Sequence, residues 1–152
     1  MIFLTDIGGP SSIALYCLVL VMFMWLHKKY SHLSQFILTM GTTAIVAVGT
    51  KELVRLPRPT GGLIPEIGYG FASAHAMMAV VFFTLIAYSY KSHFRNKITR
   101  GVFIFMCICI VLVVSMSRIY LGVHYATDVI GGLFIGLIIS SFSILMYEKH
   151  QR

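Results

Sequence analysis

The stretch Ser117–Asp128, SRIYLGVHYATD, decides the fold because it reverses the chain between two long apolar runs while holding ionisable side chains. In a helix, residues four apart share one face, so a helical stretch would bring the Asp128 carboxylate to the His124 ring. A carboxylate that accepts one ring N–H fixes the imidazole tautomer and leaves the other nitrogen free to attack an electrophile. The Arg118 guanidinium adds donors that suit phosphate oxygens.

Outward from this stretch, the chain has the composition of a membrane protein. Of its 152 residues, 58% are hydrophobic and 11% are charged, whereas a soluble domain carries about 25% charged residues. Uncharged runs approach or reach the ~17–25 residues that a spanning helix needs. These runs are Ile7–Leu26, Leu33–Thr50, Ile67–Tyr90, Gly101–Ser117 and Val129–Tyr147. We therefore expect an all-α, multi-pass transmembrane bundle of about five helices, forming a single domain over residues 1–152.

Basic residues gather in alternate connections, which predicts the orientation of the helices. Eight of the twelve Lys and Arg residues lie after the first, third or fifth run: Lys28, Lys29, Lys91, Arg95, Lys97, Arg100, Lys149 and Arg152. The positive-inside rule makes this side cytoplasmic, with the N-terminus outside and the C-terminus inside. The same distribution indicates topology and headgroup contact rather than a nucleic-acid surface, despite the net charge of +7. No basic segment precedes the first run, which we expect to be retained as an anchor.

Three segments with unusual residues are expected on the opposite, extracytoplasmic face. Lys51–Arg58 ends the second run, Phe71–His75 begins the third helix, and Arg118–Asp128 joins the fourth and fifth. Because each crossing changes sides, all three segments fall on one face. The first turn of a helix offers unpaired N–H groups and a positive dipole end, so Ser73 at that position would complete an anion site. His75 beside it is a candidate general acid.

Each segment also has a structural interpretation. Lys51, Arg55 and Arg58 could be side chains that reach from a helix end to lipid headgroups. His75 could be a satisfied structural residue, and the pair of His124 and Asp128 could fasten two helices together. Basic residues on the outer face are contrary to the positive-inside rule. Ionisable residues at membrane depth favour a functional role. The cysteines, Cys17, Cys107 and Cys109, show no metal-binding spacing and are expected to serve packing.

The spacing of these residues matches a known set of motifs. Lys51 through Arg58-Pro59 fits K-x6-R-P, and Ser117 through Asp128 fits S-R-x5-H-x3-D. Phe71–His75 stands where P-S-G-H would be expected. In these motifs, which cover about Gly41 to Ile138, the chain resembles the type 2 phosphatidic acid phosphatase family. These are membrane lipid phosphatases related to bacterial acid phosphatases and vanadium haloperoxidases.

The resemblance implies a role for each matching residue. His124 would be the nucleophile that forms a phosphohistidine, Asp128 would orient it, and His75 would protonate the leaving group. The phosphoryl oxygens would be held by Lys51, Arg58, Ser73, Arg118 and the backbone N–H of Ala74. Phosphoryl transfer mainly requires positioning and stabilisation of charge on these oxygens, which a cationic cluster can supply. The resemblance implies no metal ion and no cofactor.

The chain departs from the family pattern in two respects. Ala72 and Ala74 replace the Pro and Gly of the middle motif, and alanine does not readily adopt positive φ. If the family's glycine has positive φ, the contact of residue 74 with phosphate would be displaced. Many relatives also have six transmembrane helices, and this chain is expected to lack the first. The groove that receives lipid chains would then be more open or be completed by another protomer, as in a homo-oligomer.

The sequence therefore predicts a lipid phosphate or pyrophosphate phosphatase in the cell membrane, with an outward-facing site. The substrates implied by the resemblance are undecaprenyl pyrophosphate, phosphatidylglycerol phosphate and phosphatidic acid. A phosphotransferase that passes phosphate from the phosphohistidine to another lipid is an alternative that the sequence does not separate. A non-catalytic lipid-binding or transport component on the same scaffold is a third, supported only by Ala72 and Ala74.

Overall fold

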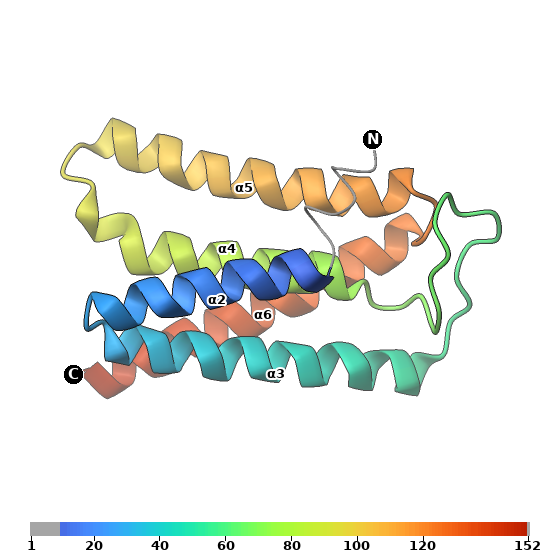
Figure 1. Ribbon diagram of the computed structural model, residues 1–152, viewed down its shortest axis with the longest axis horizontal. Helices are drawn as coiled ribbons and strands as arrows, with labels where there is room; N and C mark the ends of the chain where they lie inside the picture. Colours follow the sequence, from blue (N-terminus) through green and yellow to red (C-terminus); the bar gives the residue numbers. More distant parts are fainter. Residues whose placement is uncertain (1–9, 152) are drawn as a thin grey trace.

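The computed structural model describes residues 10–151, with side chains from residue 15 onward, and these residues form an antiparallel bundle of helices (Figure 1). The elements are α2 (Pro10–Leu26), α3 (Tyr30–Val54), α4 (Ala74–Tyr90), the short 3-10 helix η1 (Lys91–His93), α5 (Lys97–Tyr120) and α6 (Ala126–Gln151). The described part contains no strand, so the predicted all-α fold is confirmed. The predicted outer segment Met1–Gly9 lies outside the described residues.

Four of these helices are long and apolar enough to cross a membrane: α3, α4 continued by η1, α5 and α6. Helix α2 has 17 residues and is also strongly apolar, at the lower limit for a spanning helix. The chain is therefore a multi-pass membrane protein. The connections 55–73 and 121–125 lie together at one end of the bundle, while the α2–α3 turn, η1 and the end of α6 lie at the other (Figure 1).

Two helix boundaries differ from the uncharged runs of the sequence. Helix α5 begins at Lys97, four residues before the run that starts at Gly101, because the Asn96 side chain accepts a hydrogen bond from the Ile98 N–H at 2.8 Å. Such N-caps satisfy helix donors that would otherwise be free. The run that starts at Ile67 is not helical at first, since α4 begins only at Ala74.

Helix α6 begins at Ala126, and this start corrects one expectation about the site. His124 precedes the helix, so it does not share a helical face with Asp128 as the spacing suggested. Asp128 occupies the first turn and accepts a hydrogen bond from the Tyr125 N–H at 3.0 Å. A carboxylate at the third helical position that reaches back in this way stabilises a helix start. The two residues still meet, but through this capped turn.

The tight packing of α6 against α4 depends on two glycines. A Cβ atom added at Gly132 would lie 2.6 Å from the carbonyl oxygen of Ser73, and one at Gly136 would lie 2.8 Å from that of Met77. These two glycines therefore form the face of α6 that packs on α4. Small residues allow such close approach of membrane helices. As a result, the start of α4 is held directly against the first turns of α6.

Candidate active site

Backbone hydrogen bonds join the two connections at this end of the bundle. The long loop 55–73 is closed by the Gly70 N–H, which donates to the Leu56 carbonyl at 2.8 Å. It is held to the connection after α5 by the Leu63 N–H, which donates to the Leu121 carbonyl at 2.9 Å. The Ser73 N–H donates to the Asp128 carbonyl at 3.0 Å. The three segments singled out from the sequence therefore form one unit.

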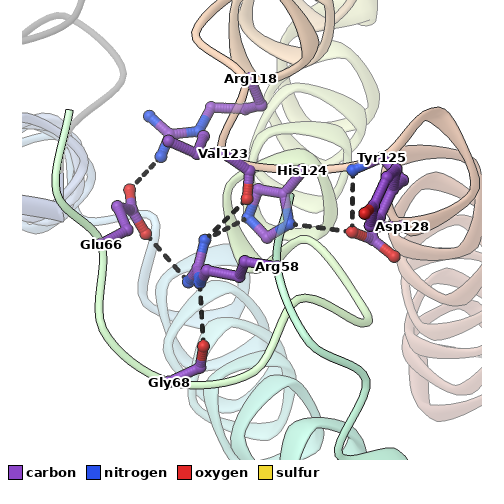
Figure 2. A network of polar contacts seen from close by, with 8 residues as sticks. All are labelled: Arg58, Glu66, Gly68, Arg118, Val123, His124, Tyr125 and Asp128. Carbon is purple, nitrogen blue, oxygen red and sulfur yellow. Dashed lines mark hydrogen bonds and ion pairs between the residues drawn. The ribbon is translucent and has the colours of Figure 1, made fainter. Parts of the chain in front are cut away.

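His124 and Asp128 form a buried pair at the start of α6 (Figure 2). Nδ1 of His124 lies 3.4 Å from Oδ2 of Asp128. On the other side of the ring, Nη1 of Arg58 lies 3.3 Å from Nε2. A guanidinium only donates hydrogen bonds, so Nε2 is the acceptor and Nδ1 carries the proton that faces Asp128. The unprotonated nitrogen therefore faces the cationic side of the site.

Arg58 is fixed by the loops on both sides of it. Its Nε donates to the Gly68 carbonyl at 3.1 Å, and its Nη1 also donates to the Val123 carbonyl at 3.0 Å. Because these carbonyls come from different connections, the guanidinium cannot move without separating from one of them. The side chain is 10% exposed, so the positive charge is largely shielded from solvent.

Glu66 is the functional candidate that the sequence interpretation missed. Its carboxylate forms an ion pair with Nη2 of Arg58 at 2.9 Å and another with Nη2 of Arg118 (Figure 2). Arg118 lies in the last turn of α5 and is 2% exposed. Glu66 thus bridges the two arginines that the motifs identify. Burial alone would raise the pKa of Glu66, but the guanidinium groups of Arg118 and Arg58 outweigh burial and hold the pKa below its usual range.

The start of α4 brings further predicted residues to the same place. Ser73 is the fully buried N-cap, and its Oγ has no hydrogen-bond partner among the described residues. The same holds for Nε2 of His75 and Nε of Arg118. Buried polar atoms are usually paired, so three unpaired atoms at one location indicate a site built for a polar ligand.

Lys51 and Ala74 complete the predicted set. Lys51 is half-buried in the last turn of α3, where its charge interacts with those of Arg58, Glu66 and Arg118. Ala74 is the first residue of α4 and does not have positive φ. Its helical conformation suits alanine, so the replacement of the family's glycine does not distort this turn.

His75 lies within electrostatic range of Arg118, Glu66, His124 and Lys51. The structure thus brings together all the residues predicted for the site: Lys51, Arg58, Ser73, Ala74, His75, Arg118, His124 and Asp128. The exposed Arg55 points elsewhere, since it pairs with Glu52 at 3.8 Å.

The ionisation of His124 gives a first prediction. Burial, assisted by the positive charge of Arg58, lowers the pKa of His124 to about 4, although Asp128 opposes the shift. The ring should therefore be neutral at pH 5 and above, and nucleophilicity should be lost only as the pH falls through about 4. Titration of the ring by nuclear magnetic resonance in detergent should give this midpoint. The Arg58→Gln variant should titrate at higher pH, and a wild-type midpoint near 6.5 would contradict the described environment.

Comparison with known proteins identifies a family model and several relatives. The model of the PAP2 superfamily matches residues 32–152. Phosphatidylglycerophosphatase B of Bacillus subtilis is 32% identical over 139 residues, which are 90% of this chain and 68% of that protein. Lipid A 4'-phosphatase of Porphyromonas gingivalis is 36% identical over 81 residues, 52% of this chain and 30% of that protein.

A solved structure has the same fold. The transmembrane PAP2 type phosphatidylglycerolphosphate phosphatase of Bacillus subtilis superposes with a TM-score of 0.86 and 28% sequence identity. The match covers 96% of this chain and 74% of that one. The similarity therefore extends over nearly all of the helical bundle.

Proposed function

Because this chain belongs to the PAP2 superfamily, we propose that it hydrolyses a phosphate ester or pyrophosphate of a membrane lipid through a phosphohistidine on His124. The observation that carries the proposal is the orientation of His124. Its Nδ1 faces Asp128 and its Nε2 faces the guanidinium of Arg58. A nucleophilic nitrogen is thereby held beside groups that would bind the phosphate it attacks.

The proposed reaction has two steps. Nε2 of His124 attacks phosphorus, the bond to the lipid oxygen breaks, and protonated His75 gives its proton to that oxygen. Water then attacks the phosphorus of the phosphohistidine, His75 takes a proton from the water, the bond between phosphorus and Nε2 breaks, and inorganic phosphate leaves. Asp128 stabilises the positive charge that the His124 ring carries while its Nε2 is bonded to phosphorus.

The phosphoryl oxygens would replace Glu66 as the partner of the two arginines. Arg58 and Arg118 already converge on one carboxylate, and a phosphoryl group presents oxygens that can take the same donors. Fixed donors of this kind stabilise the charge of the transition state. The Ser73 hydroxyl, the Ala74 N–H and Lys51 would contact the remaining oxygens.

An apolar groove between α4, α5 and α6 would receive the hydrocarbon part of the substrate. It has a volume of about 410 Å³ and an almost wholly apolar lining that includes Val80, Val111 and Leu133. Val111 lies seven residues before Arg118, which places both on the same side of α5. A lipid chain in this groove would therefore lead toward the phosphate-binding arginines.

Two finer statements belong to the same proposal. The site would face the extracytoplasmic side, because the basic connections at the opposite end follow the positive-inside rule. Phosphatidylglycerol phosphate is the favoured substrate, since the Bacillus subtilis relatives are named for that activity. Phosphatidic acid and undecaprenyl pyrophosphate are the other candidates, and transfer to a second lipid is the alternative to hydrolysis.

The test is phosphate release by the purified chain in detergent from these three lipids, with a chelator present. We expect release from at least one lipid at a rate that the chelator does not change, because the site uses cationic side chains for charge stabilisation. Radioactive labelling of the substrate phosphate should give an acid-labile phosphoprotein. Labelled lipid product in place of inorganic phosphate would identify a phosphotransferase. The absence of both products would refute catalysis.

A further inference from the structure

A second basic cluster lies at the end of the bundle opposite the candidate active site. It surrounds a pocket of about 320 Å³ formed by the end of α2, the α2–α3 turn, the end of α4, η1 and the start of α5. Three of the side chains that line this pocket are basic: His27, Lys29 and His93. They come from connections 64 residues apart in the chain, so the fold rather than the local sequence brings them together.

Lys29 is the centre of this cluster, and no described group in contact with it carries a negative charge. Its Nζ lies 3.1 Å from Nε2 of His93 and 4.4 Å from the centroid of the Tyr90 ring. A lysine ammonium only donates, so Nε2 of His93 is the acceptor in this contact. Burial also lowers the pKa of Lys29. These contacts leave the ammonium charge without a counter-ion.

The carboxylates of the described residues are all engaged elsewhere. Glu52, Glu66 and Asp128 form their ion pairs at the other end of the bundle. Glu148 accepts a hydrogen bond from the Tyr88 hydroxyl at 3.1 Å and does not line the pocket. Lys29 therefore differs from Arg58 and Arg118, whose charges Glu66 balances. An uncompensated cation in a pocket favours a negatively charged ligand.

The rest of the pocket is aromatic, which determines the kind of anion. Phe23, Phe94 and Phe103 form its apolar wall, and the Phe94 and Phe103 rings lie 4.8 Å apart. Tyr90 also lines the pocket, and its buried hydroxyl has no partner among residues 15–151. A cationic rim over an aromatic wall suits a ligand with a charged head and an apolar body. A free phosphate ion would contact only the rim.

We propose that this pocket binds the phosphate of an anionic phospholipid from the leaflet opposite the candidate active site. Lys29 and His93 would hold the phosphate, and the aromatic wall would contact the upper part of the lipid chains. The bound lipid would connect α2, α4 and α5 at an end where Lys29 otherwise contacts, among residues 15–151, only basic and aromatic groups. Its effect should therefore be on the stability of the bundle rather than on the chemical step.

The test compares thermal unfolding of the full chain in phosphatidylcholine nanodiscs with and without phosphatidylglycerol. We expect phosphatidylglycerol to raise the Tm of the wild-type protein by about 3 °C or more, a shift typical of a modest gain in stability for a chain of this size. The Lys29→Gln/His93→Gln variant should lose at least half of the shift. Lys28→Asn is the matched control: it removes the neighbouring exposed charge, and asparagine tolerates the positive φ at that position.

Each outcome of this comparison is decisive. Equal shifts for the wild-type protein and the double variant would overturn the proposal, as would loss of the shift in Lys28→Asn, which would indicate a diffuse charge effect. An equal rise in Tm from inorganic phosphate in phosphatidylcholine nanodiscs would show that the pocket binds a free ion. If the double variant does not fold, native mass spectrometry of Lys29→Gln should show fewer retained phosphatidylglycerol molecules than Lys28→Asn, and equal retention would refute the site.

Discussion

Replacing His124 with alanine should abolish phosphate release, with a loss in kcat/KM on the order of 10⁴-fold or more. The imidazole presents an unprotonated nitrogen, Nε2, to the guanidinium of Arg58, which in turn pairs with Glu66 beside Arg118. Removing the nucleophile of a covalent mechanism removes the first step itself, and such losses reach about 10⁶-fold in well-studied hydrolases. The measurement is phosphate release from whichever of the three candidate lipids the wild-type protein hydrolyses fastest, at saturating and at low substrate concentration.

The matched control is His150→Ala, which removes an exposed histidine near the end of α6. Its activity should stay within about twofold of wild type, because the residue lies at the opposite end of the bundle. Both variants should show the same helical content and nearly the same Tm. A His124→Ala protein that folds and still releases phosphate at the wild-type rate would refute the assignment of the nucleophile.

Replacing Arg118 with alanine should reduce kcat/KM by roughly 10²–10³-fold, the loss that follows removal of one preorganised donor to a transition state. The guanidinium is buried, so its charge acts in surroundings that screen it weakly. Kinetics with the same lipid should place most of the loss in kcat, since the contact would strengthen as charge develops on the phosphoryl oxygens.

Arg55→Ala is the control for loss of a positive charge near the same face. Arg55 is exposed and pairs only with Glu52 in its own turn, so its removal should change kcat/KM by less than about threefold. Arg118→Lys adds a second comparison, because lysine keeps the charge but lacks the planar pair of donors. A loss below ~10-fold in Arg118→Ala would mean that this residue does not contact the transition state.

Much of the bundle could be predicted from the sequence because helices that span a membrane correspond to long runs of uncharged residues. The placement of Lys51, Arg58 and Arg118 at one end of the bundle also followed, since each crossing of the membrane changes sides. The start of α5 could have been placed correctly as well. Asn96 is a strong N-cap residue, and its position before Lys97 was the available signal.

Two features of the site could not be predicted from the sequence: the role of Glu66 and the backbone conformation at His124. Glu66 is a single acidic residue in a loop rich in Gly and Pro, and its role depends on how the loop folds over the end of α5. His124 was expected within a helix because its spacing from Asp128 is four. The helix starts later, because the Asp128 carboxylate caps the Tyr125 N–H and so fixes the first turn. Local spacing predicted the contact but not the backbone conformation that makes it.

The ion pairs of Glu66 have a consequence for the end of the catalytic cycle. Inorganic phosphate would compete with the Glu66 carboxylate for both guanidinium groups. Because Glu66 is part of the same chain, its effective concentration at the site is high. The intramolecular competitor would shorten the residence time of the product and limit inhibition by phosphate in the surroundings. Tight retention of the product by these guanidinium groups would thus be avoided, because Glu66 takes the place of the departing phosphate.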